Sequence, residues 1–124
     1  MATTLKQPEQ TTYTIDATGR TLGRVASEAA HALLGKRSPL VSKHRTHPIK
    51  VIVENASKLH VSTARKEGKV YLRYTGYPGG QRAMTMAEMI EKKGIEEVVR
   101  KTVDGMIPRN RLRKPRMKNL VVKA

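Results

Sequence analysis

Residues Thr12–Gly35, T-Y-T-I-D-A-T-G-R-T-L-G-R-V-A-S-E-A-A-H-A-L-L-G, predict a strand, a turn and a helix in succession. The β-branched and aromatic side chains of Tyr13–Asp16 favour a short strand, and Ala17–Arg20 is typical of a turn. Thr21 is suited to cap a helix, because apolar side chains recur after it at helical spacing, and Gly35 is suited to end it. This succession is the building block of a sheet covered by helices.

The rest of the chain continues the alternation of strands and helices. The elements that we expect are, in order, a strand at Ile49–Val53, a short strand at Leu59–Ser62, a charged connector at Thr63–Lys69, a strand at Val70–Tyr74, a helix from Thr85 to about Lys93, a helix from Ile95 to about Asp104, a short helix at about Arg109–Lys114 and a strand at Leu120–Val122. Thr85 and Glu88 form a capping box, and the apolar, β-branched run at Ile49–Val53 is typical of a strand buried on both faces. The predicted fold class is α/β, with a mostly parallel central sheet between helices.

Length and composition restrict the classes of protein that remain. The 124 residues fit a single domain over residues 12–124, preceded by a polar and flexible tail at residues 1–11. The chain has no cysteine, which excludes disulfides and zinc sites with thiolate ligands. It has no apolar run of about 18 residues and no apolar core of a signal peptide. We therefore expect a protein of the cytoplasm, or of an organelle, with no membrane contact.

The chain is strongly basic, and the position of its charge points to a polyanionic partner. Lysine and arginine total 25 against 10 acidic residues, for a net charge of +15. Residues 29–53 contribute five of these cations and residues 105–124 contribute seven, both without an acid, so 5 + 7 = 12 of the net charge lies there. A solvated face normally mixes both signs. We therefore interpret both segments as phosphate-binding.

Tyr71–Arg82, Y-L-R-Y-T-G-Y-P-G-G-Q-R, combines three tyrosines, three glycines and two arginines without an acid. Its glycines and Pro78 predict a sharply shaped loop after the strand. A loop of this kind exposes backbone N–H groups, arginines and aromatic rings, which suit phosphates and unstacked bases. Strand alternation places Tyr71 and Tyr74 on opposite faces, so we expect one of them in the core. Tyr77, with Tyr74, is then the better candidate for a contact with RNA.

Four segments of the sequence, in order, resemble one family. They are Thr12–Gly35, quoted above, Val51–Lys58 (V-I-V-E-N-A-S-K), the T-G-Y-P-G-G string of Thr75–Gly80, and Gly105–Leu112 (G-M-I-P-R-N-R-L). Together they are similar to the bacterial-type large-subunit ribosomal protein L-thirteen family and span most of Thr12–Leu120. Two departures are Tyr74, where many relatives have a histidine, and Thr46–Ile49, where many have an Asp-x-Gly-Asp stretch.

The resemblance implies a three-layer α/β/α fold with about four central strands. It also implies a structural constituent of the large ribosomal subunit that binds large-subunit (23S-type) rRNA, supports early subunit assembly in translation and contacts neighbouring ribosomal proteins. No cofactor and no small-molecule substrate are expected. With the charge pattern, it leads us to expect RNA contacts at Lys36, Arg37, Lys43, His44, Arg45, Arg73, Tyr74, Thr75, Gly76, Tyr77, Pro78, Gly79, Gly80, Arg82, Arg109, Asn110, Arg111, Arg113, Lys114, Arg116 and Lys118.

Enzymatic and metal-binding interpretations find little support in the sequence. Gly19–Gly23 lies between a strand and a helix, but neither dinucleotide-binding nor Walker-type glycine spacing is present. His44 and His47 have a spacing that can bind a metal, yet no cysteine or carboxylate beside them completes a site. No nucleophile, base and orienting acid can be assembled. A general nucleic-acid binder and a small nucleotide-dependent enzyme remain as alternatives that do not explain the four segments.

Overall fold

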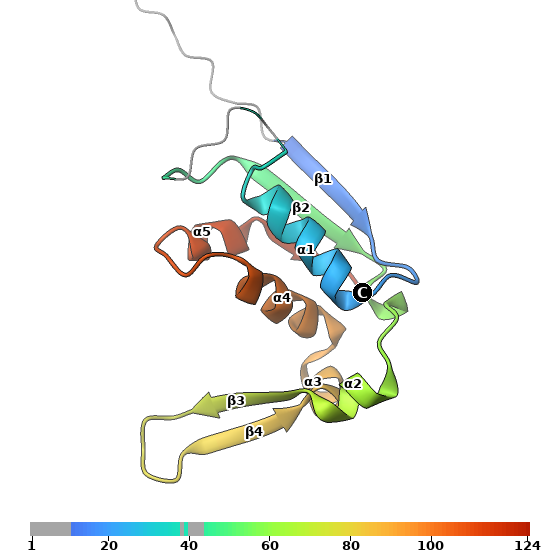
Figure 1. Ribbon diagram of the computed structural model, residues 1–124, viewed down its shortest axis with the longest axis vertical. Coiled ribbons are helices and arrows are strands. Elements are labelled where there is room, and N and C mark those ends of the chain that lie inside the picture. The colour runs from blue at the N-terminus through green and yellow to red at the C-terminus, as the bar shows by residue number, and fades with distance from the viewer. Residues whose placement is uncertain (1–10, 38, 40–43) are drawn as a thin grey trace, which may run out of the picture.

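A three-stranded parallel sheet organises the chain in the computed structural model, which describes residues 11–37, 39 and 44–124 (Figure 1). Its strands are β1 (Thr11–Asp16), β2 (Ile49–Glu54) and β5 (Leu120–Val122), and β2 lies between the other two. Both pairings are parallel, with Tyr13 beside Val51 and Val51 beside Leu120. The α/β class and the mostly parallel sheet are confirmed.

Two helices cover one face of this sheet, where the buried core lies (Figure 1). They are α1 (Leu22–Leu33) and α4 (Ile95–Met106), which also pack against each other. The strands contribute a row of side chains to this face, and Val51 and Val53 in the central strand are fully buried. Val25 of α1 and Val99 of α4 are buried to the same degree. Side chains at helical spacing therefore meet alternate side chains of the strands.

The second face of the sheet differs from our expectation of three layers. Thr14, Ile52 and Val121 are neighbours on that face, and Thr14 is exposed while the other two are half-buried. No described helix buries them. The predicted strand Leu59–Ser62 is reduced to a single bridge between Thr21 and His60, so the sheet has three strands instead of about four. The β-branched run of β2 alternates between buried and half-buried positions, which is the pattern of a sheet covered on one face.

A hairpin and two short helices form the second part of the described chain, at the other end of its long axis (Figure 1). Helix α2 (Thr63–Gly68) replaces the predicted connector, and Ser62 caps it by accepting a hydrogen bond from the Arg65 N–H at 3.4 Å. Strand β3 (Val70–Tyr74) was expected. Its antiparallel partner β4 (Gln81–Thr85) was not.

The remaining elements lead the chain back to the sheet. The threonine half of the predicted capping box is present at the start of α3 (Met86–Lys93), where Thr85 Oγ1 accepts a hydrogen bond from the Glu88 N–H at 3.3 Å. Gly94, at φ +87°, separates α3 from α4. Helix α5 is Arg113–Lys118, four residues later than predicted. Pro115 lies in its first turn, where a missing N–H has no helical partner to lose.

The end of β1 is held by a small polar network around Asp16. Its Oδ1 accepts hydrogen bonds from the Thr18 N–H at 3.0 Å, the Thr18 hydroxyl at 2.8 Å and the Asn55 side-chain amide at 3.1 Å. Asn55, at φ +57°, precedes the short 3-10 helix η1 (Ala56–Lys58). These bonds, led by the one from the Thr18 N–H, lower the pKa of Asp16 to about 2.

Candidate nucleic-acid interface

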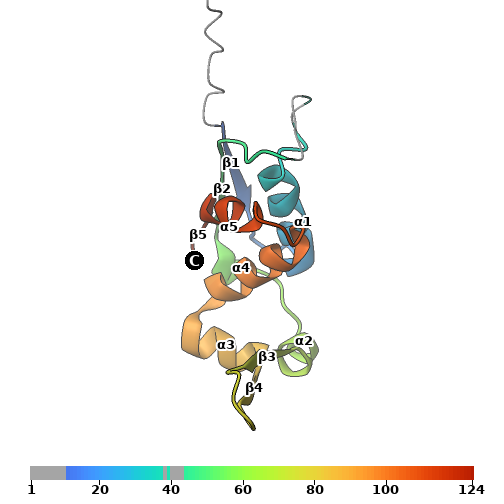
Figure 2. The same ribbon diagram turned by 90° about the vertical axis from the view of Figure 1, so that its left-hand side faces the viewer.

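Three basic segments lie along one side of the molecule, at different heights on its long axis (Figures 1 and 2). Residues 44–48, in the described part of the α1–β2 loop, are at one end, the C-terminal segment from residue 107 to α5 is near the middle, and the β3–β4 hairpin is at the other end. All three point toward the left in Figure 1 and toward the viewer in Figure 2. The fold thus brings the predicted segments to a common side, while keeping them apart along it.

The hairpin places two arginines directly opposite each other. Arg73 of β3 and Arg82 of β4 are cross-strand partners, and both are exposed. Among the described residues neither forms an ion pair with an acid. Like charges at directly opposed positions destabilise an antiparallel pair. An anion that contacts both side chains would relieve this repulsion.

The loop beyond these arginines has a defined backbone. The Thr75 N–H donates to the Gly80 carbonyl at 3.2 Å, and the Gly80 N–H donates to the Tyr77 carbonyl at 2.9 Å. Gly76 and Gly79, at φ +91° and +71°, adopt angles that favour glycine. Pro78 lies between Tyr77 and Gly79 on the exposed part of this turn. The loop therefore has a shape set by its own hydrogen bonds.

The tyrosines of the hairpin divide as strand alternation predicts. Tyr71 is half-buried and packs against the core, whereas Tyr74 is 66% exposed. Tyr77, at the tip, is 75% exposed. Tyr77 is thus presented to solvent at the tip, where its ring is suited to stacking on RNA bases. Strand alternation puts Tyr74 on the hairpin face opposite to that of Arg73.

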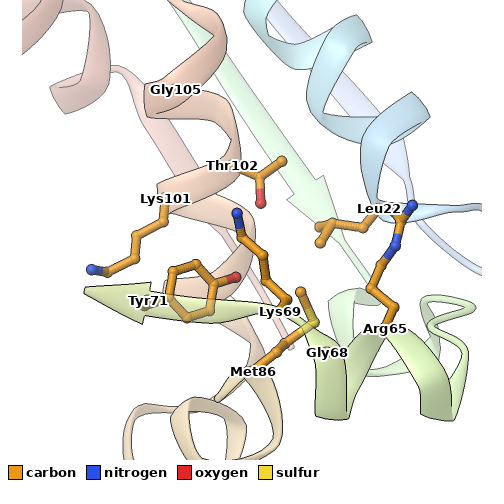
Figure 3. Close-up of a pocket in the computed structure, with 9 residues that line it drawn as sticks. All are labelled: Leu22, Arg65, Gly68, Lys69, Tyr71, Met86, Lys101, Thr102 and Gly105. Carbon is orange, nitrogen blue, oxygen red and sulfur yellow. The ribbon is translucent and has the colours of Figure 1, made fainter. Parts of the chain in front are cut away.

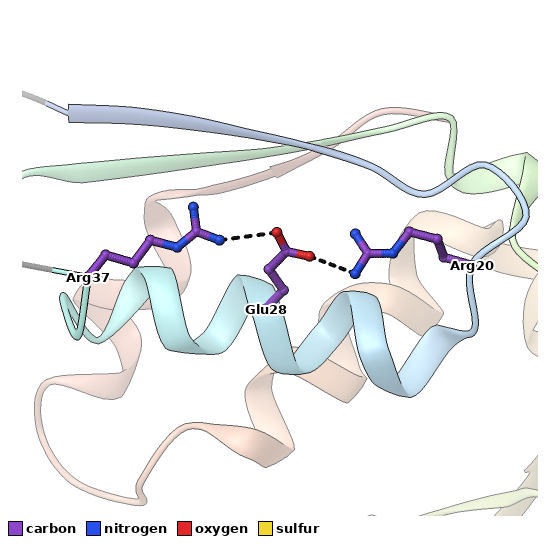
Figure 4. Close-up of polar contacts among 3 residues, drawn as sticks. All are labelled: Arg20, Glu28 and Arg37. Carbon is purple, nitrogen blue, oxygen red and sulfur yellow. Dashed lines mark hydrogen bonds and ion pairs between the residues drawn. The ribbon is translucent and has the colours of Figure 1, made fainter.

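In the middle of α1, one carboxylate engages two arginines that lie toward opposite ends of the helix (Figure 4). Glu28 pairs with Arg20 at 2.7 Å and with Arg37 at 3.1 Å, and the guanidinium of Arg37 lies 4.8 Å from the centre of the Tyr13 ring. The hydrogen bond from Arg20 is the main cause that lowers the pKa of Glu28. Arg37 is therefore held against α1 by this ion pair, and both it and the neighbouring Lys36 are exposed.

The α1–β2 loop is described only in part. His44 and Arg45 are exposed, and Lys43 lies outside the described residues. In the described part of the chain, no group of three or more histidine, cysteine, aspartate or glutamate side chains is placed to hold a metal ion. Nor is any helix of that part long and apolar enough to cross a membrane.

The C-terminal segment presents most, but not all, of its predicted cations. Arg109, Arg111, Lys114 and Lys118 are exposed, as is Asn110, whose side-chain oxygen accepts the Leu112 N–H at 3.0 Å. Arg113 pairs with Asp104 at 3.4 Å. Arg116 differs, because it is only 3% exposed and its Nε has no hydrogen-bond partner among the described residues. Because so little of this residue is exposed, we expect it to contribute less to an RNA contact than the exposed cations of the segment.

Sequence reasoning missed three further cations, Arg65, Lys69 and Lys101, which line a cleft around Tyr71 (Figure 3). They come from α2, the start of β3 and α4, and no other signal in the sequence connects these elements. Acids lie near them along the chain, so they stand in neither acid-free segment. Only the folded chain brings them together.

Known proteins with similar sequences agree on a single family. Residues 10–123 match the family described as Ribosomal protein L13. A Large ribosomal subunit protein uL13 from Moorella thermoacetica is 42% identical over 98% of this chain and 86% of its own length. Proteins of the same name from Rubrobacter xylanophilus and Geobacter sulfurreducens are 41% and 39% identical, over 94% and 90% of this chain and 80% and 78% of theirs.

These relatives are structural proteins of the ribosome and not enzymes, and the match covers every basic segment described above. The expected family, the large-subunit assignment and the absence of an enzymatic role are thereby confirmed. The chain belongs to the ribosomal protein L13 family, whose members are proteins of the large ribosomal subunit.

Proposed function

We propose that this chain binds large-subunit rRNA through the basic side of the molecule and thereby supports early assembly of the subunit in the cytoplasm. The observation that carries the proposal is the opposed pair Arg73 and Arg82, exposed and without an acidic partner among the described residues. Such a pair costs stability in the free protein and gains a favourable interaction when a phosphate lies between its members.

The mechanism is electrostatic and structural. The cations of the three basic segments neutralise phosphates where RNA helices approach each other. The release of condensed counterions then favours binding. Because neutralisation lowers the repulsion between RNA segments, protein binding and RNA folding favour each other. The chain has no tryptophan or phenylalanine, so recognition rests on shape and phosphate contacts, with stacking limited to exposed tyrosines.

Neighbouring ribosomal proteins are proposed partners of the other face of the hairpin. Val70, Leu72 and Tyr74 lie on that face and are 45%, 66% and 66% exposed. Ala83 lies opposite Leu72. This apolar strip has no charged side chain that could bind a phosphate, but it can pack against an apolar segment of another protein.

The test is sedimentation of the protein from cell extract. We expect it to co-sediment with large ribosomal subunits at moderate salt, and the purified protein to prefer folded large-subunit rRNA over duplex DNA of equal length. A protein that stays in the soluble fraction, or that binds duplex DNA equally well, would contradict the proposal and favour a general nucleic-acid binder. For the assembly role, omission of the protein from in vitro reconstitution should leave particles that sediment more slowly than complete subunits.

A further inference from the structure

A cleft of about 610 Å³ lies where the hairpin meets the body of the protein (Figure 3). Its polar lining comes from α2, the start of β3 and α4, and the side chains that matter are Arg65, Lys69, Tyr71, Lys101 and Thr102. Leu22 and Met86, both buried, form its apolar part. Among the described residues, no acidic side chain lines this cleft.

The ammonium groups of Lys69 and Lys101 lie on two sides of the Tyr71 ring in this cleft (Figure 3). The Nζ atoms of Lys69 and Lys101 each lie 5.6 Å from the centre of the Tyr71 ring. The ring attracts both cations, but it cannot remove the repulsion between them. Within the described part of the chain neither lysine, nor Arg65, forms an ion pair with an acid. The cleft thus holds three cations whose charges are balanced by no carboxylate of the described lining.

The remaining groups suit a phosphodiester. The Thr102 hydroxyl donates its one proton to the Val98 carbonyl at 2.8 Å, so the donors left for a phosphate are the three cations and the Tyr71 hydroxyl. The Tyr71 hydroxyl is protonated at neutral pH and can donate a hydrogen bond, and partial burial raises its pKa further. Apolar Leu22 and Met86 offer a surface to a ribose. Cations beside an apolar wall are the groups that a sugar–phosphate backbone requires.

A backbone phosphate fits this cleft better than a free anion does. All three cations are on exposed side chains, where solvent weakens their attraction for a small ion. An RNA held by the rest of the interface presents its phosphates at a high effective concentration, so a modest local attraction is sufficient.

We propose that this cleft binds one backbone phosphate of the rRNA beside Tyr71, with Lys69 and Lys101 contacting it from two sides of the ring, and so joins the hairpin to α4 in the complex. The inference rests on the proposed function, since the same RNA supplies the phosphate. It adds a contact between the base of the hairpin and α4, and α4 is outside the three basic segments. Binding there would fix the hairpin relative to α4, because the two lysines belong to different parts of the fold.

The test compares two double variants of the full chain that remove the same charge. Lys69→Gln with Lys101→Gln alters the cleft, and Lys92→Gln with Lys93→Gln alters exposed lysines at the end of α3 that do not line it. The slope of log affinity against log salt for folded large-subunit rRNA should fall by about 0.7 to 0.9 in the cleft variant. If the variant and the wild type bind equally at 1 M salt, the variant should bind about five- to eightfold more weakly at 0.1 M salt. This factor is about 10^0.7 to 10^0.9, the slope difference over one decade of salt concentration. The control should keep the wild-type slope.

Acylation of lysines, read by mass spectrometry on the unmodified protein, gives a second measurement that does not depend on variants. Lys69 and Lys101 should become protected in the rRNA complex, while Lys92 and Lys93 stay reactive. The inference would be overturned if both double variants had equal slopes, or if the cleft lysines stayed reactive in the complex. Binding of rRNA by the wild-type protein would still support the proposed function in either case. Protection of both lysines by inorganic phosphate or ATP at micromolar concentration, without RNA, would also overturn the inference, since the site would then serve a small anion. Failure of the wild-type protein to bind rRNA would instead reject the proposed function.

Discussion

Arg73 and Arg82 lie directly opposite each other across the β3–β4 hairpin, with no acidic partner in the described residues. The pairing register, and not the sequence spacing, makes them neighbours. A protein that functioned alone would gain from an oppositely charged pair at this position.

Replacement of both arginines by alanine should therefore weaken the binding of rRNA without lowering the stability of the free protein. We expect the free energy of unfolding of the free protein to stay equal or to rise by about 0.2–1 kcal/mol, the range of a cross-strand pair. Affinity for rRNA should fall, and the salt slope should drop by about 0.7 to 0.9 for each phosphate that is no longer neutralised. Urea unfolding and filter binding measure the two effects. A clear loss of stability would show that the pair is not repulsive in the free protein.

The C-terminal segment is expected to be a second anchor. Replacement of the exposed Arg109, Arg111 and Lys114 by alanine should lower the salt slope by about 2 to 3, for up to three neutralised phosphates. The matched control lies in the same segment. Arg116→Met removes a buried guanidinium and should leave the slope unchanged.

The stability of the Arg116→Met variant carries its own information. Because the Arg116 Nε lacks a partner among the described residues, an apolar side chain of similar length should be neutral or stabilising. A salt slope that falls with Arg116→Met would show that this side chain leaves the interior to reach the RNA.

Gly80 is expected to control the shape of the loop. A Cβ atom added there would collide with Thr75 Oγ1 and lie 2.9 Å from the Tyr77 carbonyl oxygen. Gly80→Ala should weaken rRNA binding and destabilise the hairpin by about 1–3 kcal/mol. Gly23→Ala is the control, because a Cβ in that position of α1 meets nothing within 4 Å, and it should leave stability unchanged or slightly raised. Hydrogen exchange of the hairpin amides measures the local effect, and equal exchange in both variants would contradict it.

Asp16 predicts how stability responds to acid. Its pKa in the folded protein is about 2, lowered first by the Thr18 N–H and then by the Thr18 hydroxyl and Asn55, against 3.8 for the free group. A lowered pKa means that the contribution is present above pH 4 and is lost as the pH falls toward 2. Asp16→Asn should flatten the dependence of unfolding free energy on pH in this window, measured with urea. Glu67→Gln, at an exposed carboxyl of α2, should keep the wild-type dependence.

Local signals in the sequence predicted the elements whose stability is local. The threonine half of the capping box, at Thr85, starts α3 as expected, and Gly94 ends it. Thr21 precedes α1 as predicted, although its side chain makes no capping hydrogen bond. Thr11, assigned to the flexible tail, begins β1, and residues 1–10 lie outside the described part. Residues next to a strand can join it through pairing that propensity does not record.

The missed elements depended on contacts between distant residues. Gln81–Thr85 contains few β-branched side chains and becomes a strand because β3 pairs with it. The expected strand Leu59–Ser62 pairs with the described residues only at His60 and remains a single bridge. Helix α5 begins at Arg113, since the turn at Asn110 occupies the residues before it. Pairing partners and turn geometry decided these cases.

The sequence by itself determined the family, the α/β class, the turn chemistry of the glycine-rich loop and the sign and amount of charge, because these follow from residue types and short spacings. Only the tertiary structure decided how the cations are arranged. It set Arg73 against Arg82, buried Arg116, engaged Arg37 with Glu28, and placed Lys69 and Lys101 around Tyr71. Burial and strand register arise from contacts between segments far apart along the chain, so local residue patterns do not contain them.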